Sequence, residues 1–316
     1  MYYCKLASTS TLIVTIDGPA GSGKSTAARL SAGRLGFGYL DSGALYRIAA
    51  LKWLQLTAGE TRASTDPPAG TAESRARLLD KLAVALDIGL FVDREGSLRY
   101  LLDGEDVSGK IRDERVGNAA SVVSAHAPIR ERITEIQRRF VARLQHAGES
   151  EDDVRKHEGD ISKREGDVEI DTGAREDDVG NAIIASHDIA SRDTTSRDIT
   201  SRDDQNRRPR GVVVEGRDIG TVVFPDADLK FFLDASPQIR AQRRAEELRR
   251  RGEEADVDEI YERILERDRR DRTRVVAPLI AAGDAIVLDS SSRSIEEIVG
   301  DIVTRVEDRM SSSGHD

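Results

Sequence analysis

The nine residues from Gly18 to Thr26 read Gly-Pro-Ala-Gly-Ser-Gly-Lys-Ser-Thr and directly follow an apolar run, residues 12–16. The pattern G-x-x-x-x-G-K-[ST] after a buried strand predicts a phosphate-binding loop, because glycines let successive backbone N–H groups point at phosphate oxygens. Residues 27–35 have the small and apolar spacing of a helix, whose N-terminal dipole favours the same anion. Sequence and flanking elements therefore agree on nucleotide binding.

Two other nucleotide folds fit this loop less well. A dinucleotide-binding turn needs a third glycine where Thr26 stands. A guanine-reading N-K-x-D is excluded because the chain contains no Asn-Lys pair. A turn that merely joins a strand to a helix is disfavoured because strand, loop and helix arrive in order. The loop thus predicts ATP as ligand, with Lys24 on the outer phosphates and Ser25 on Mg²⁺. The residues expected to bind ATP here are Gly18, Pro19, Ala20, Gly21, Ser22, Gly23, Lys24, Ser25 and Thr26.

Composition limits the class of protein. With 38% apolar and 34% charged residues among 316, the chain has the balance of a soluble protein, and its longest apolar runs are strand-sized. The first ten residues lack the hydrophobic stretch of a secretory signal. Cys4 is the only cysteine, which excludes an intramolecular disulfide and a thiolate metal cluster. The five histidines show no ligand spacing. We expect a cytoplasmic protein without a membrane partner.

The acidity is concentrated in one segment. Residues 147–206 carry 18 acidic and eight basic side chains, which accounts for the whole net charge of −10. This segment has no aromatic residue and contains a five-residue repeat beginning at Ser186, a period that fits neither helix nor strand. It predicts a disordered or weakly helical loop insertion, either inert or acting as a partner-binding arm. The rest is electrically balanced, so no nucleic-acid partner is expected.

Outside that segment, strands and helices alternate. Strands are predicted at 12–16, 38–40, 211–214, 229–233 and 286–288, and helices at 27–35, 44–56, 72–82 and 129–144. Two stretches with period-two patterning, 84–92 and 97–102, predict a β-hairpin. The fold class is therefore α/β, with a parallel sheet covered by helices on both faces.

Several segments of the sequence resemble the bacterial cytidylate kinases. Beside the phosphate loop, these are Leu40-Asp-Ser-Gly-Ala-Leu-Tyr-Arg47, Asp103-Gly-Glu-Asp-Val-Ser108, Asn118-Ala-Ala-Ser121, Glu215-Gly-Arg-Asp-Ile-Gly-Thr221 through Phe232-Leu-Asp-Ala235, and Arg267-Asp-Arg-Arg-Asp-Arg-Thr-Arg274 with Ala277-Pro-Leu. The phosphate loop is generic, whereas the Gly-Arg-Asp block and the arginine cluster in this order are highly specific. Together they extend over nearly the whole chain except its ends and the acidic segment.

The resemblance implies a nucleoside monophosphate kinase fold. Its parts are a phosphate-loop core in residues 1–61 and 207–316, a substrate-binding insert at 62–114, a core helix region at 115–146 and a mobile lid near 236–252. Arg240, Arg243, Arg244, Arg249, Arg250 and Arg251 crowd into the lid, and Arg243 and Arg244 are expected to bind ATP. The alternative is a solvated helix face on which Glu246 and Glu247 partner these arginines.

The same resemblance implies transfer of the γ-phosphoryl group of ATP, with Mg²⁺, to CMP or dCMP. Lys24, Arg217 and Arg274 are the expected catalytic cations, and Arg47, Arg217 and Arg274 grip the acceptor phosphate through their planar forks. Asp218 accepts from the cytosine amino group and Arg130 donates to the ring, with Ser42 nearby. Ser121, Arg267 and Asp271 hold the sugar. Arg47 has an alternative as a surface ion-pair member.

The sequence departs from the family pattern at one position, and two other functions remain as alternatives. Glu215 stands where some family members have Asp, which leaves its part in holding Mg²⁺ open. The chain could phosphorylate another small acceptor, or it could be a nucleotide-binding regulator without turnover. Nucleotides are the expected partners, and we expect a monomer.

Overall fold

The computed structural model describes residues 11–57, 72–92, 98–146 and 210–312. The chain divides into two units, one made of residues 1–142 with 209–316 and the other of residues 143–208. All the strands in the described part belong to the first unit. The acidic segment 147–206 lies outside the described residues, so its predicted disorder stays a prediction.

A five-stranded parallel sheet forms the centre of the first unit, with strand order β2-β6-β1-β7-β8. Its strands are β1 Leu12–Asp17, β2 Gly38–Asp41, β6 Gly211–Gly216, β7 Leu229–Asp234 and β8 Ile286–Asp289. β1 pairs on one side with β6, where Asp17 lies opposite Gly216, and on the other with β7. β2 pairs with the outer side of β6, where Asp41 lies opposite Glu215. The carboxyl ends of β1, β2 and β6 therefore meet at one edge, where α/β sheets bind ligands.

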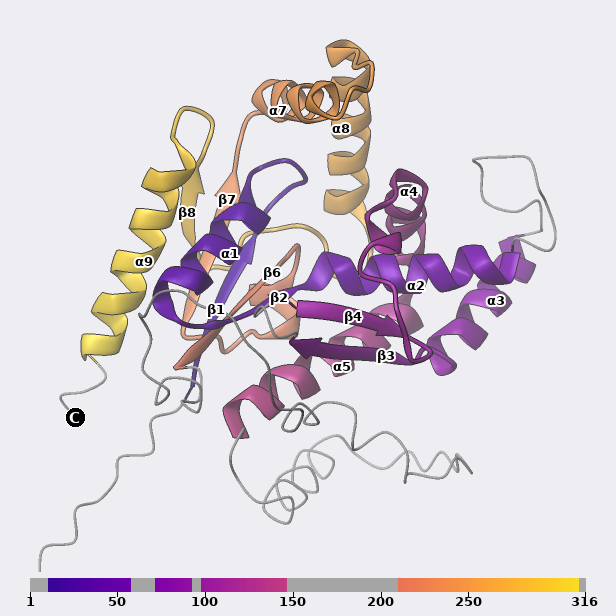
Figure 1. Cartoon of the computed structure of the whole chain (residues 1–316), viewed down its shortest axis with the longest axis horizontal. Helices are drawn as coiled ribbons and strands as arrows, with labels where there is room; N and C mark the ends of the chain where they lie inside the picture. Colours follow the sequence, from indigo (N-terminus) through magenta and orange to yellow (C-terminus); the bar gives the residue numbers. More distant parts are fainter. Residues whose placement is uncertain (1–10, 58–71, 93–97, 147–209, 313–316) are drawn as a thin grey trace, which may run out of the picture. The chain divides into compact units, whose positions relative to one another are not determined.

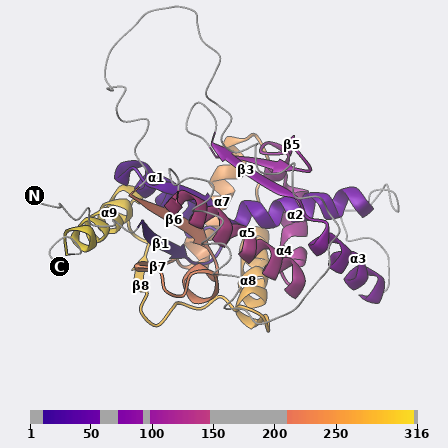
Figure 2. The ribbon, with the colours of Figure 1, turned by 90° about the horizontal axis from the view of Figure 1, so that it is seen from below.

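The sheet is buried against helices, as the near-continuous apolar strands predict. Helices α1 (Lys24–Leu35) and α9 (Ile295–Ser312) share one core cluster with the strands, and Figures 1 and 2 show both helices beside the sheet. Val14, Val213 and Val299 are fully buried in this cluster. Helix α2 (Ser42–Thr57) contacts β6. The predicted α/β fold with a parallel sheet and flanking helices is confirmed.

A second, smaller sheet belongs to the region of the predicted insert. Strands β3 (Ile88–Val92), β4 (Leu98–Leu102) and β5 (Glu105–Asp106) are antiparallel in that order. The predicted hairpin is confirmed, but its first strand is shorter than expected. Residues 84–87 were predicted as strand, whereas Val84 is the last residue of α3 (Ala72–Val84) and is 82% exposed. In the sequence, an apolar residue at the end of an amphipathic helix cannot be distinguished from the first residue of a following strand.

One helix occupies the region of the predicted lid, and a second helix packs on it. β7 leads into α7 (Pro237–Arg250), whose first turn is capped by the Ser236 hydroxyl accepting from the Ile239 N–H at 3.3 Å. α8 (Val257–Thr273) packs on α7 through Ala241, Ala245 and Ile260, and the two helices lie together in Figure 1. The arginine cluster that begins at Arg267 thus forms about the last two turns of α8.

The remaining elements connect these parts. The short helix η1 (Lys110–Arg112) and helix α4 (Glu114–Val123) both contact α2, and α5 is a long helix (Ala127–His146). A single π-helical turn, Ile219–Val223, follows β6. The helices α4, α8 and α9 and this turn were not predicted from the sequence. No helix in the described part is both long and apolar enough to cross a membrane.

Candidate active site

The predicted phosphate loop joins β1 to α1. Gly18 (φ 151°) passes so close to β7 that a Cβ would lie 2.1 Å from the Leu233 carbonyl oxygen. Gly23 (φ 87°) is the N-cap of α1, in the left-handed region that glycine adopts without strain. The Ser22 hydroxyl donates to the Pro19 carbonyl at 3.0 Å and so braces the loop from inside. The loop thus presents the start of α1 in the geometry that favours an anion.

Lys24 and Ser25 lie at the start of α1 and meet Glu215 from β6. The Lys24 ammonium is 3.9 Å from Glu215 Oε2 and donates to the Pro19 carbonyl at 3.3 Å, and the Ser25 hydroxyl donates to Glu215 Oε1 at 2.7 Å. Burial lowers the pKa of Lys24 to about 8, with the Arg217 charge as a second cause. Burial, together with the charge of Asp41, raises the pKa of Glu215 to about 7. A phosphate placed here would favour the charged form of the lysine further.

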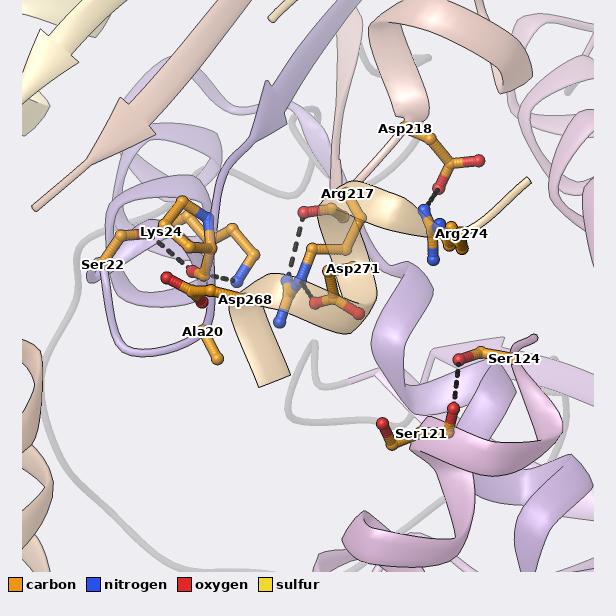
Figure 3. A network of polar contacts seen from close by, with 12 residues as sticks. Ala20, Ser22, Lys24, Ser121, Ser124, Arg217, Asp218, Asp268, Asp271 and Arg274 are labelled. Carbon is orange, nitrogen blue, oxygen red and sulfur yellow. Dashed lines mark hydrogen bonds and ion pairs between the residues drawn. The ribbon is translucent and has the colours of Figure 1, made fainter. Parts of the chain in front are cut away.

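Asp218 is the centre of a buried charge cluster just past β6. Its carboxylate pairs with the Arg130 guanidinium from α5, and both side chains are 5% exposed. Arg274, at the end of α8, reaches the other carboxylate oxygen at 3.5 Å (Figure 3). Arg130 also donates to the Ser124 carbonyl at 3.0 Å and lies over the ring of Tyr46, 5.5 Å from its centre. The structure therefore brings together three predicted residues from three separate stretches of chain.

A second cluster lies along α8. Arg217 contacts Asp271 at 3.3 Å, as Figure 3 shows. Burial and the charge of Arg217 lower the pKa of Arg267 to about 10, and the Arg267 Nε has no hydrogen-bond partner among the described residues. The nearby charge of Arg47 acts in the same direction. Cations held this close, one with an unused buried donor, favour an anionic ligand.

Arg47 is held between α2 and the region of the predicted insert. It donates to the carbonyls of Ile111 at 2.9 Å and Asp113 at 3.4 Å. Burial lowers its pKa, and so do the charges of Arg112 and Arg244. Both of these acceptors are backbone carbonyls, and the role of Arg47 toward the acceptor phosphate stays a prediction.

Two predicted serines lie on different helices. Ser42 begins α2, is 3% exposed, and accepts a hydrogen bond from Gln137, whose own amide oxygen is buried without a partner in the described part. Ser121 lies on α4, and its carbonyl accepts from the Ser124 hydroxyl at 3.2 Å (Figure 3). The role of Ser121 toward a sugar stays a prediction.

The lid arginines divide into two groups. Arg240 was grouped with the lid arginines, for which a solvated helix face was the alternative, and that alternative does not hold for Arg240. It is 1% exposed and forms a two-pronged pair with Asp268 of α8, at 3.0 and 2.6 Å. Its guanidinium also donates to the Ala20 carbonyl of the phosphate loop at 3.1 Å. A side chain enclosed in this way links α7, α8 and the loop rather than awaiting a ligand.

The other lid arginines lie nearer the surface. Arg244 and Arg251 both pair with Glu247, as the alternative of a solvated helix face predicts. Arg243 donates to the Ser290 hydroxyl at 3.2 Å and to its carbonyl, next to β8. The expectation that Arg243 and Arg244 bind ATP stays a prediction.

Sequence reasoning missed Asp17 and Gln137. Asp17 ends β1, is 5% exposed, and accepts from the backbone of the turn that follows Asp218. A carboxylate at the carboxyl end of a buried strand, directly before a phosphate loop, is a signal that could have been used. Gln137 carries no such signal, because its hydrogen bond to Ser42 joins α5 to α2 and becomes visible only in the fold.

A family model described as cytidylate kinase matches residues 14–154 and 150–308 of this chain. The chain belongs to the cytidylate kinase family. Cytidylate kinase of Pelotomaculum thermopropionicum is 37% identical over 293 residues, which cover 93% of this chain and 95% of that relative. Those of Mannheimia succiniciproducens and Aeromonas salmonicida are 33% and 35% identical, over 96% and 94% of this chain and 99% and 95% of the relatives. The resemblance seen in the sequence is confirmed.

The residues present fit the Mg²⁺ that a cytidylate kinase implies, provided that the nucleotide supplies part of the ligand set. Ser25 and Glu215 offer a hydroxyl and a carboxylate 2.7 Å apart, and hard cations such as Mg²⁺ prefer oxygen ligands. Among residues 11–57, 72–92, 98–146 and 210–312, no group of three or more His, Cys, Asp or Glu side chains could hold a metal alone. Phosphate oxygens and water would complete the shell.

Proposed function

We propose that this chain transfers the γ-phosphoryl group of ATP to CMP and dCMP. The observation that carries the proposal, beside family membership, is the position of the Arg130–Asp218 pair. Asp218 follows β6 by two residues, and the phosphate loop follows the neighbouring strand β1, with Asp17 opposite Gly216. A base reader and a triphosphate loop that leave adjacent strand ends are within reach of one reaction.

On the donor side, the loop amides and Lys24 hold the phosphates of ATP. The Lys24 pKa of about 8 makes the ammonium easy to neutralise when no anion is near, and a bound polyphosphate favours its charged form. Ser25 and Glu215 would hold Mg²⁺, which when bound neutralises charge developing on the transferred group. The positive charge of the Lys24 ammonium acts in the same direction.

On the acceptor side, Asp218 and Arg130 read the base. Cytosine presents an amino donor beside two acceptors, so a carboxylate and a guanidinium in fixed register complement it. Uracil places a carbonyl where cytosine has the amino group, and a buried carboxylate facing a carbonyl loses its hydrogen bond. We therefore infer a preference for cytosine over uracil that is real but not absolute.

Chemistry at this site needs no protein nucleophile, because the acceptor phosphate oxygen is already anionic. Arg47, Arg217 and Arg274 supply positive charge around it; Arg217 now contacts Asp271, and Arg274 contacts Asp218. These carboxylates hold the guanidinium planes in place before the acceptor phosphate arrives. Catalysis is then positioning plus electrostatic stabilisation.

Measuring ADP formation with ATP and Mg²⁺ tests this proposal, with CMP, dCMP, UMP, AMP and GMP as acceptors. We expect strong turnover with CMP and dCMP, weak turnover with UMP and none with purines. Turnover limited to another acceptor would favour a kinase for a different metabolite. Tight ATP binding without turnover on any acceptor would favour a regulator. Neither alternative gains support from the relatives found. The monomeric state and the cytoplasmic location stay predictions.

A further inference from the structure

The carboxylate of Asp17 connects the two halves of the candidate site. Asp17 is the last residue of β1 and precedes Gly18, the first residue of the phosphate loop. Its Oδ1 accepts from the Ile219 N–H at 2.9 Å, and its Oδ2 accepts from the Gly220 N–H at 2.8 Å. Both donors belong to the turn directly after Asp218. One side chain on the donor side therefore holds the backbone on the acceptor side.

The peptide group after Asp218 is held at both ends. Its N–H, which belongs to Ile219, donates to Asp17. Its carbonyl, which belongs to Asp218, accepts from the Val222 N–H at 2.9 Å and the Val223 N–H at 3.3 Å. Fixing this peptide plane limits the backbone freedom of Asp218, and so sets the direction in which its carboxylate leaves the chain.

Glycine is required for the turn to come this close. A Cβ on Gly220 would lie 2.8 Å from the Thr15 hydroxyl oxygen, on the strand that carries Asp17. A Cβ on Gly216 would lie 2.6 Å from the Ile219 side chain, within the turn itself. Both positions must therefore lack a side chain for the two N–H groups to reach the carboxylate.

Burying the charged Asp17 carboxylate is unfavourable, and its two hydrogen bonds offset this cost only in part. Burial raises the pKa of Asp17 to about 6, while the bonds from Gly220 and Ile219 lower it. Asp218 raises this pKa further and Arg217 lowers it. At neutral pH the group is ionised, so both oxygens accept charge-assisted hydrogen bonds.

We propose that Asp17 is a positioning residue for the phosphoryl acceptor: by holding the Ile219 and Gly220 amides, it fixes Asp218 relative to the phosphate loop. The proposal rests on the proposed function, since it concerns where the cytosine base is held. Asp17 acts through the turn and needs no contact with either nucleotide. Its loss should therefore affect the acceptor and spare ATP.

Asp17→Asn tests this, because asparagine keeps the shape but turns one acceptor oxygen into a donor that faces an N–H. We expect the KM for CMP to rise about tenfold or more and the preference for CMP over UMP to shrink, with the KM for ATP within about threefold of wild type. Asp228→Asn is the matched control. The Asp228 carboxylate accepts from the Ile13 N–H at 2.8 Å, at the other end of β1, and its loss should leave both constants unchanged.

Hydrogen exchange at the Ile219 and Gly220 amides provides a second reading that does not depend on turnover. Asp17→Asn should speed exchange at these two amides and leave the β1 amides as in wild type. If Asp17→Asn does not fold, Gly220→Ala should reproduce the selective rise in the KM for CMP, because its Cβ pushes the turn away from β1.

Equal rises in both Michaelis constants, no change in either, or unchanged exchange at the two amides would each overturn the proposal. An inactive wild-type protein would instead count against the proposed function. Faster exchange at the two amides in Asp17→Asn would still show that Asp17 holds the Ile219 and Gly220 N–H groups.

Discussion

Arg130 and Asp218 form an ion pair at 5% exposure each, although 88 positions separate them in the chain. The acidic segment lies between them in sequence, yet α5 and the end of β6 still meet. Each charge depends on the other, since a buried unpaired arginine or carboxylate is strongly unfavourable. The pair is thus part of the fold, and we propose that it also reads the cytosine base.

Removing Asp268 should destabilise the protein by about 3–5 kcal/mol, because Arg240 would be left as a buried charge without a partner. Urea unfolding of Asp268→Ala measures this. In Arg240→Met/Asp268→Leu, apolar groups replace both partners, and part of the loss should be recovered. Glu247→Ala is the control, since it removes only exposed pairs and should cost less than about 1 kcal/mol. A loss in Asp268→Ala no larger than in this control would show that the buried pair contributes little.

Lys24→Met should lower turnover by about 10²–10³-fold, since the variant lacks the cation next to the transferred group. Methionine keeps most of the side-chain volume in a position that is 6% exposed, so the free energy of unfolding should change little. Steady-state kinetics and urea unfolding check both statements. Turnover within about tenfold of wild type would mean that the lysine is not positioned as the loop predicts.

Asp17 should make stability depend on pH. Its pKa is raised from 3.8 to about 6, so the folded protein holds the proton more tightly than the unfolded chain does. The raised pKa adds to the free energy of unfolding. This contribution is complete below about pH 4 and is lost as the pH rises through about 6. The loss is about 3 kcal/mol, and Asp17→Asn lacks it. The difference in free energy of unfolding between wild type and variant should therefore fall between about pH 4 and pH 7. A difference that rises over this range would contradict the assignment.

Deleting residues 147–206 should leave the fold and the turnover intact, because their composition cannot bury enough apolar surface to form a core. The variant is compared with the full chain by CMP turnover and by urea unfolding. A soluble deletion variant whose activity is lower by more than about tenfold would indicate that the segment contributes to the site.

The sequence predicted the sheet well, because parallel strands buried on both faces leave an apolar run that is hard to misread. From the sequence, Val84 was placed in a strand, and the helices α4, α8 and α9 were not predicted. The apolar positions of α9, among them Ile298 and Ile302, recur at helical spacing, so that signal was present in the sequence and was not used.

The sequence indicated which residues to consider for the candidate site, but not which contacts they make. Arg240 shows the difference. In the sequence it belongs to a row of similar arginines, and only the packing of α7 on α8 selects it for burial against Asp268. The position of Asp17, directly before the phosphate loop, was a signal that could have been used, but its partners are backbone N–H groups, which no sequence pattern displays.

The most direct test of the account is the effect of Asp218→Ala on the two substrates separately. The account predicts that kcat/KM for CMP falls by about 10²-fold or more, because Arg130 and the base both lose the carboxylate, while the KM for ATP stays within about threefold. Equal losses on the CMP and ATP sides would contradict it, and would mean that Asp218 supports the fold rather than reading the base.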